Sequence, residues 1–447
     1  MNSTVLWKQR TSLLLLMVAA GISISWGIAL ERGGRLGVMG FPGIYFGTRC
    51  LIQGGDPYDV GQLQRVYDSA GFSESSSVAL RQSANLYVNL PATFLLVAPF
   101  ALLPLAVGQT VWLVILIGTF LLAGFLMWNL ADAYSPAVAL LLSFIALANC
   151  EIIFSGGNTA GLVVSLCVIA VWCFLQGRCI PAGILCLALG LAVKPHDAGL
   201  IWLYFILAGR VHRMRALKAL GVSLILALAA LAWVTRVAPN WVPELRSNLA
   251  TISGHGGINE PGPTSIGVNS PDMIIDLQTL VSVFADDPGI YNPLTYAVCA
   301  VLFAGWSIAV LKFSRSPQNA WFALVSASAL SMLVTYHRTY DAKLLLLAIP
   351  ACAMLWAQRG VIAWVSLVLT AGAFVFTADI PLAILVDMTR NRYSPTASFA
   401  EKGLTALLTR PAPILLSAIA VFYLAVFACR ARSESIGCHN LGTDITS

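Results

Sequence analysis

The chain has 447 residues, of which 58% are hydrophobic and only 10% are charged. A soluble domain carries about a quarter charged residues, so this composition excludes a soluble protein and predicts an integral membrane protein. The formal net charge of +6 is spread along the chain without a block of like charges, which argues against a nucleic-acid partner.

Apolar runs of roughly 20 residues, the length that a bilayer core requires of a helix, repeat along almost the whole chain. We expect an all-α polytopic membrane protein, a single domain over residues 1–447 with about 12 transmembrane helices. The expected spans are residues 12–30, 106–129, 136–154, 158–176, 179–193, 197–209, 217–236, 291–311, 319–335, 341–357, 360–378 and 411–429.

The distribution of lysine and arginine predicts the orientation of these spans. With a cytoplasmic N-terminus, the inside segments hold 12 of the 26 Lys and Arg residues in about a third of the length of the outside segments. Such an excess is typical of cytoplasmic loops. We expect a plasma-membrane protein with both termini cytoplasmic, long outer loops at 31–105, 237–290 and 379–410, and a cytoplasmic tail at 430–447.

The first outer loop is expected to be structured. Its GGDPYD sequence at 54–59 favours a tight turn, because Asp-Pro sets the entry and the glycines permit positive φ. The preceding IYFGTRCLI at 44–52 is typical of a short surface helix. Residues 89–105 are apolar but contain three prolines, and a full span there would reverse the positive-residue pattern. A re-entrant or surface-lying helix on the outer side is predicted instead.

Ionisable residues interrupt apolar sequence at KPHD, residues 194–197. A charge near the bilayer centre costs about 2.5–3.5 kcal/mol on insertion scales, so such groups face an internal cavity or an interface. Lys194 suits a phosphate, and His196 and Asp197 can orient a ligand or each other. The alternative is a snorkelling lysine followed by a helix-starting Pro-His-Asp turn.

YHRTYDAK at 336–343 repeats this pattern just before a purely apolar run. In the predicted topology, KPHD and YHRTYDAK both lie at junctions between helices on the outer side. Arginine and histidine beside tyrosine suit an anionic head group at the membrane surface, which makes His337 and Arg338 candidate ligand residues. An interfacial anchor is the alternative, because Tyr and Arg are common at that depth. Six ionisable side chains within eight residues exceed what anchoring needs, which favours a binding site.

The loop at 253–280 is rich in Gly, Pro, Ser and Asn and then turns helical from Asp272, a pattern typical of an ordered lid beside a site. His255 lies among its glycines without further ligands at defined spacing, and no CxxC spacing occurs in the chain. The sequence therefore predicts neither a metal site nor a cofactor.

Four segments, in order over most of residues 40–360, together resemble glycosyltransferase family 87. GTRCLIQGGDPYD resembles the first-loop motif of the family, and NLYVNLPATFLLVAPFALLPLAVGQTVW resembles its proline-containing apolar segment. The block from FSGGN to KPHD is similar to the family's G-Q-x-N and K-P block, and YDAKLLLLAIP is similar to its later Y-D segment. The resemblance implies the GT-C fold.

The family is similar to the polyprenol-phosphate-mannose-dependent α-(1→2)-mannosyltransferases. The resemblance therefore implies transfer of a hexose, expected to be mannose, from a polyprenyl-phosphate sugar to a lipid or glycan acceptor at the outer face, with inversion. Asn158 and His255 are assigned to the acceptor side or the lid. The candidate ligands of the donor phosphate are Lys194, His196, His337 and Arg338.

The expected general base of the family is an aspartate that opens the first-loop motif, and Gly40 stands at that position in this chain. The candidates for another base are Asp56, Asp59, Asp197 and Asp341. Two alternatives stay open: a transporter or flippase for a lipid-linked sugar, which needs no base, and a catalytically impaired GT-C pseudoenzyme.

Overall fold

The computed structural model of the chain describes residues 3–32, 40–70, 86–265, 268, 273–313, 316–389 and 393–443. Within these residues every regular element is a helix, and a single antiparallel bridge pairs Ile274 with Arg338. The all-α prediction is therefore confirmed for the described part of the chain.

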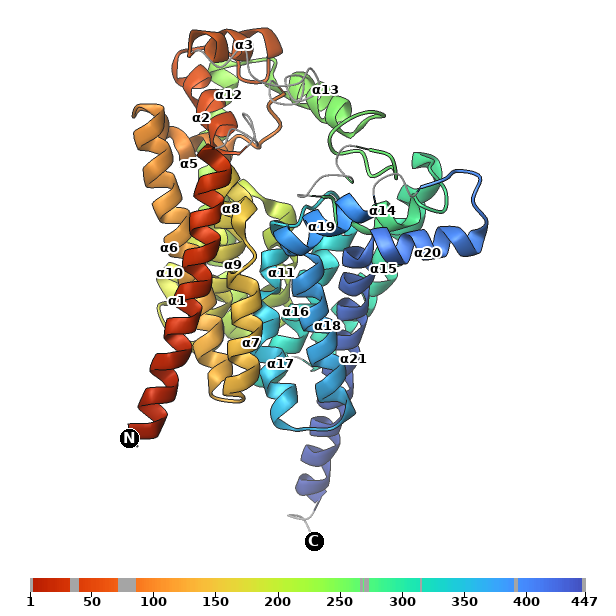
Figure 1. The fold of residues 1–447 in the computed structure, drawn as a ribbon. Coiled ribbons are helices and arrows are strands. Elements are labelled where there is room, and N and C mark those ends of the chain that lie inside the picture. The colour runs from red at the N-terminus through yellow and green to blue at the C-terminus, as the bar shows by residue number, and fades with distance from the viewer. Residues whose placement is uncertain are drawn as a thin grey trace.

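Most of the helices stand side by side in one bundle (Figure 1). The first part of the chain forms α1 (Ser3–Arg32), α2 (Phe41–Ile52), α3 (Val60–Ser69), α5 (Ala92–Ala101), α6 (Leu105–Asp132), α7 (Pro136–Leu147), α8 (Glu151–Gly156), α9 (Thr159–Gln176), α10 (Ile180–Val193) and α11 (Pro195–Leu207). The second part forms α12 (Arg210–Val237), α13 (Trp241–Ser253), α14 (Leu277–Val281), α15 (Pro288–Phe313), α16 (Pro317–Val334), the 3₁₀ helix η1 (Asp341–Leu347), α17 (Ala348–Ala357), α18 (Val361–Phe376), α19 (Asp379–Thr389), α20 (Phe399–Thr409) and α21 (Pro411–Thr443).

Six helices in the described residues are long and apolar enough to cross a membrane. Their candidate spans are Arg10–Ala29, Leu105–Asp132, Thr159–Gln176, Arg210–Val237, Pro288–Phe313 and Pro411–Arg430. Counting the bent pair of α18 and α19 as one span gives up to seven. The prediction of a polytopic membrane protein agrees with these helices, whereas the predicted count of about 12 spans is not confirmed.

One predicted span is broken, and two others form helices too short to cross a membrane. The predicted span at 136–154 is divided between α7 and α8, while the predicted spans at 179–193 and 197–209 form α10, with 14 residues, and α11, with 13. At a rise of 1.5 Å per residue, 14 residues extend about 21 Å, which is less than the ~30 Å of a hydrocarbon core. Hydropathy alone does not locate such breaks.

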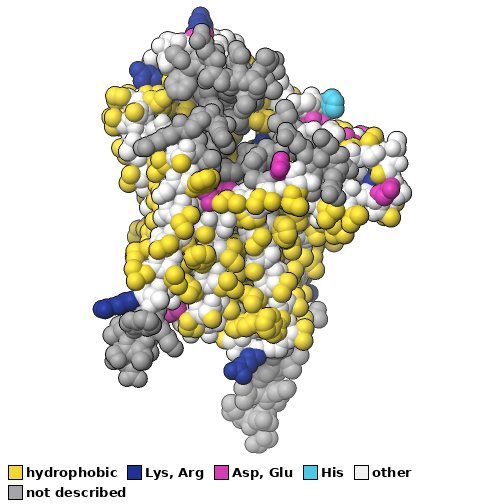
Figure 2. Space-filling model, in the orientation of Figure 1, with side chains coloured by type: hydrophobic (Ala, Val, Ile, Leu, Met, Phe, Trp, Pro, Cys, Tyr) yellow, Lys and Arg dark blue, Asp and Glu magenta, His cyan; other side chains and the backbone are white. Residues whose placement is uncertain are grey.

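The bundle has a buried centre and an apolar exterior. In α9, 83% of the candidate span is buried, against 22% in α12 and 28% in α15. α16 is also buried along nearly its whole length. On the face shown in Figure 2, apolar side chains cover the body of the bundle, as expected of a surface that contacts lipid tails.

One end of the bundle, which we call the loop end, carries α2, α3, α13 and α20 (Figure 1). The N-terminal end of α1 and the C-terminal end of α21 lie at the opposite end. The side of the membrane on which the loop end lies stays a prediction.

The first loop forms helices at the loop end. GGDPYD separates α2 from α3, which confirms the predicted turn and the helix before it. Most of α2 is buried, so this helix does not lie on the surface as expected. Within 89–105 the chain forms α5, a helix of 10 residues with Pro99 inside it, which is too short to cross a membrane alone.

Gly40, where the resemblance places an aspartate, packs against the end of α8. Its φ is +94°, and a Cβ built there would lie 1.7 Å from the carbonyl oxygen of Gly156. The adjacent Phe41 ring stacks on Trp112 with centroids 5.4 Å apart, and the Trp112 indole donates to the Gly157 carbonyl at 2.7 Å. These contacts fix α2 against the α8–α9 junction, and no side chain at position 40 fits this backbone arrangement.

Replacing Gly40 by alanine should therefore destabilise the protein more than replacing Gly54. Gly54 is a matched control, because its φ is +83° and a Cβ added there would meet no atom within 4 Å. Both changes carry the strain of positive φ, but only Gly40→Ala adds a steric clash, which costs about 1–3 kcal/mol. Thermal unfolding in detergent measures the difference, and equal Tm values would contradict the packing described.

Candidate active site

KPHD forms the break between α10 and α11. Lys194 ends α10 and also begins α11, with φ −137° and ψ 78°, outside the helical region. Pro195 is the first residue of α11, where its fixed φ suits a helix start and its missing N–H leaves no orphan donor. Because the residue before proline avoids helical angles, the sequence itself places the break at Lys194.

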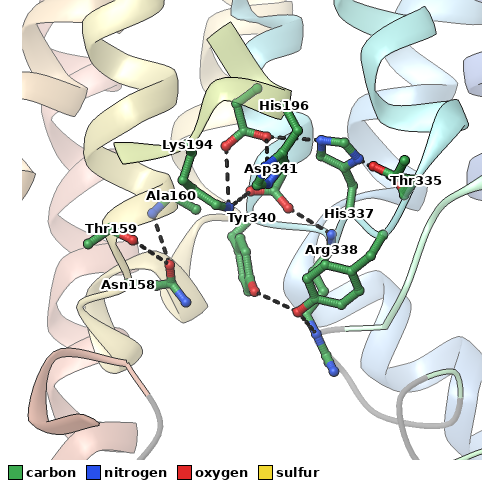
Figure 3. Close-up of polar contacts among 12 residues, drawn as sticks. Asn158, Thr159, Ala160, Lys194, His196, Thr335, His337, Arg338, Tyr340 and Asp341 are labelled. Atoms are coloured by element: carbon green, nitrogen blue, oxygen red, sulfur yellow. Dashed lines mark hydrogen bonds and ion pairs between the residues drawn. The ribbon is translucent and has the colours of Figure 1, made fainter. Parts of the chain in front are cut away.

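The side chain of Lys194 lies between two buried aspartates (Figure 3). Its Nζ atom donates to Asp341 Oδ1 at 2.8 Å and lies 3.3 Å from Asp197 Oδ2. Both aspartate side chains are 1% exposed and that of Lys194 is 14% exposed. Nζ also lies 5.5 Å from the centre of the Tyr340 ring. The network joins α10 and α11 to η1, whose first residue, Asp341, lies 147 residues after Lys194 in the chain.

Two histidines lie beside Asp197. Nε2 of His337, which is fully buried, lies 3.0 Å from Asp197 Oδ1. Nδ1 of the same ring lies 2.8 Å from the carbonyl oxygen of Thr335. His196 is 40% exposed and its Nε2 lies 3.8 Å from Asp197 Oδ1. The two predicted polar segments therefore meet in one cluster of charged and imidazole groups.

The backbone of YHRTYD turns around Asp341. After α16 ends at Val334, the Arg338 N–H donates to Asp341 Oδ2 at 2.8 Å. The Arg338 guanidinium, also buried, donates through Nε to the Tyr336 hydroxyl at 2.7 Å and through Nη2 to the Ile258 carbonyl at 2.8 Å. Asp341 thus holds both Lys194 and the turn that carries Arg338.

The loop at 253–280 reaches this turn. Besides the Ile258 contact, the Ile275 N–H donates to the His337 carbonyl at 2.9 Å. The helix predicted from Asp272, which itself lies outside the described residues, begins at Leu277. Its start is late because Ile274 pairs with the turn and Asp276 caps α14. The cluster therefore lies beneath the loop end, close to the segment that was predicted to be a lid.

The two residues assigned to the acceptor side lie outside the cluster. Asn158 begins α9, and its side-chain oxygen accepts from the Ala160 N–H at 2.9 Å, as an N-cap does. Figure 3 shows it on the neighbouring α8–α9 junction, with no contact drawn to the cluster. His255 is 96% exposed and its Nδ1 lies 2.9 Å from Glu260 Oε1.

Asp56 and Asp59 organise the first-loop turn. Asp56 Oδ1 accepts from the Tyr58 N–H at 2.9 Å, and Asp59 caps α3 by accepting from the Gln62 N–H at 2.9 Å. Glu244, on α13, interacts with the Asp56 carboxylate. Burial and this neighbouring carboxylate raise the pKa of Glu244 to about 7.

A second buried charged cluster was not predicted from the sequence. Lys343 Nζ donates to the carbonyl oxygens of Asn149 at 2.8 Å and Thr377 at 3.1 Å. The buried Glu151 carboxyl group interacts electrostatically with Lys343 and with the buried carboxyl group of Asp379. Glu151 is the only acidic residue between positions 133 and 196. A lone acidic residue inside apolar sequence is the feature from which this buried cluster could be predicted.

The fold and the cluster define a helical membrane protein with a polar site inside its bundle. Residues 87–335, more than half of the chain, match the family model of glycosyltransferase family 87. The chain belongs to this family, which makes it a membrane glycosyltransferase, and the predicted resemblance is confirmed. The match contains KPHD and ends directly before YHRTYD. No curated protein and no solved structure shows a significant match.

Replacing Lys194 by methionine should strongly destabilise the protein, because the change leaves two buried carboxylates facing each other. Removing one partner of a buried ion network costs about 3–5 kcal/mol. Adding Asp341→Asn to Lys194→Met should restore part of the loss, and the exposed Lys312→Met is the control. A double-mutant cycle by thermal unfolding measures the coupling, and additive effects would contradict the network.

Stability should fall as the pH rises from roughly 4.5 to 7, because folded Glu244 holds its proton more tightly than the unfolded chain does. Glu244→Gln should remove this part of the pH dependence, so that the variant gains Tm relative to wild type at pH 8 but not at pH 4.5. Asp68→Asn, on the exposed face of α3, is the control. Parallel pH profiles of wild type and Glu244→Gln would show that the carboxyl pair does not form.

Proposed function

We propose that this glycosyltransferase moves a hexose, specifically the mannose implied by the resemblance, from a polyprenyl-phosphate sugar to a lipid or glycan acceptor. In this proposal the loop end faces outward from the plasma membrane, both termini are cytoplasmic, and the anomeric carbon is inverted. The observation that carries the proposal is the meeting of KPHD with YHRTYD in one buried cluster beneath the loop end.

The position of the cluster supports a donor that is partly lipid. A polyprenyl chain requires an apolar path, and a phosphate requires cations or donors at the depth of a lipid head group. The proposed site combines the apolar exterior of the bundle with Lys194 and His196 at the α10–α11 break and His337 and Arg338 in the turn before η1. His196 is 40% exposed, against 14% for Lys194 and 0% for His337, so we assign it the first contact with the phosphate.

The proposed reaction is a direct displacement at the anomeric carbon. An acceptor hydroxyl oxygen bonds to that carbon, the bond to the phosphate oxygen breaks, and polyprenyl phosphate leaves with the bonding electron pair. Negative charge grows on the leaving phosphate, so cations placed there lower the barrier. A base that accepts the hydroxyl proton contributes roughly 10²- to 10⁴-fold. Asp197 and Asp341 are the candidates inside the cluster, and Asp56 is the candidate in the first-loop turn.

If this assignment is right, His196→Ala should reduce transfer about 10-fold or more without lowering Tm, because a charged hydrogen bond contributes about 1.5–3 kcal/mol. Arg338→Lys, which keeps the charge but loses the planar fork, should also reduce transfer. The control is His212→Gln, a histidine on α12.

The assay measures polyprenyl phosphate released from polyprenyl-phosphate-mannose by protein in lipid nanodiscs, with a membrane extract as acceptor. Release that depends on acceptor supports the transferase. Movement of the intact donor across the bilayer without release would support the transporter instead. Wild-type rates in both His196→Ala and Arg338→Lys would contradict the proposed phosphate site.

A further inference from the structure

The imidazole of His337 faces the carboxylate of Asp197, and this buried contact requires a cation between the two groups. Its Nδ1 lies 2.8 Å from the Thr335 carbonyl oxygen, which only accepts, so Nδ1 carries the hydrogen. Its Nε2 lies 3.0 Å from Asp197 Oδ1, yet in the described residues no hydrogen-bond partner is aligned with Nε2. With Nδ1 as its only N–H, the ring turns the Nε2 lone pair toward the Asp197 carboxylate, and two buried acceptors at this distance require a proton or a metal ion between them.

His196 brings a third ligand atom to the same point. Its Nε2 lies 3.8 Å from Asp197 Oδ1, and one ligand atom from each of the three residues lies within 4.8 Å of the others. In a tetrahedral zinc site with bonds of about 2.0–2.2 Å, ligand atoms are separated by roughly 3.3–3.6 Å. Because His196 is 40% exposed, its ring has room to turn the short distance that this geometry requires.

The groups around these three residues are those that support a metal ion. The bond from His337 Nδ1 to a backbone carbonyl is the usual arrangement that orients a metal-binding histidine. Lys194 holds the other oxygen of Asp197 at 3.3 Å and leaves Oδ1 on the histidine side. Lys194 contributes +1, and Asp197 and Asp341 contribute −2, so with neutral histidines these five side chains sum to −1. A divalent ion changes this net charge to +1.

We propose that His196, Asp197 and His337 bind one divalent transition-metal ion of the zinc type. Two imidazoles and one carboxylate are ligands that zinc accepts, and three protein ligands leave a coordination position open. On the function proposed above, that position is available to a phosphate oxygen. The sequence predicted no metal because His337 lies 140 residues beyond Asp197, so the ligands have no local spacing.

Metal binding is tested without any transfer assay, so its failure is distinguishable from failure of the proposed function. The full chain in detergent is treated with a chelator, dialysed, and titrated with Co²⁺ while its visible absorption is recorded. We expect one Co²⁺ per chain, with the intense bands of a four- or five-coordinate site, displaced by one Zn²⁺. His196→Ala should weaken binding at least about 10-fold while leaving Tm of the metal-free protein unchanged.

His337→Gln is the second variant and should also lose the absorption bands, with its Tm recorded to exclude unfolding. His212→Gln is the control and should bind as wild type does. An absorption spectrum no different from that of aqueous Co²⁺ would overturn the proposal and identify the extra cation as a proton on His337. Equal Co²⁺ affinity in wild type and His196→Ala would overturn it as well.

Discussion

The ion network of Lys194 with Asp197 and Asp341 determines how the distant segments of the site come together. A charge buried away from water is unstable unless it is paired, so the three side chains must meet if they are to lie inside the bundle. Their meeting fixes the break between α10 and α11 against the start of η1. The same Asp341 carboxylate holds the turn that carries Arg338, and Arg338 in turn binds the loop that follows α13.

The sequence predicted the polar segments of the site better than it predicted their partners. KPHD and YHRTYD were identifiable because charge is rare in this chain and costly at membrane depth. Lys194 was expected to meet a phosphate, but its nearest groups are carboxylates, because pairing over 147 residues leaves no local pattern. The break at Lys194 agrees with the predicted spans 179–193 and 197–209. The break between α7 and α8 lies inside the predicted span 136–154, because hydropathy counts apolar residues and does not detect it.

The packing of Gly40 explains why glycine stands where the resemblance implies an aspartate. The aspartate expected at this position would collide with the Gly156 carbonyl, so glycine here allows α2 to approach the α8–α9 junction. A base for the reaction proposed above must then come from elsewhere in the chain. In our proposal the base is a carboxylate of the ion network, which the pairs with Lys194 hold in place, or that of Asp56 in the first-loop turn.

If KPHD and YHRTYD together form the donor site of this family 87 glycosyltransferase, the phosphate of the donor must bind beside them. A cryo-electron microscopy structure of the protein in nanodiscs with polyprenyl phosphate locates that phosphate. We expect its density next to His196 and Arg338, beneath the loop end, with the lipid chain leaving along the apolar exterior. Phosphate density at the opposite end of the bundle, or beside the Lys343 cluster with the Lys194 network unoccupied, would contradict the proposed donor site.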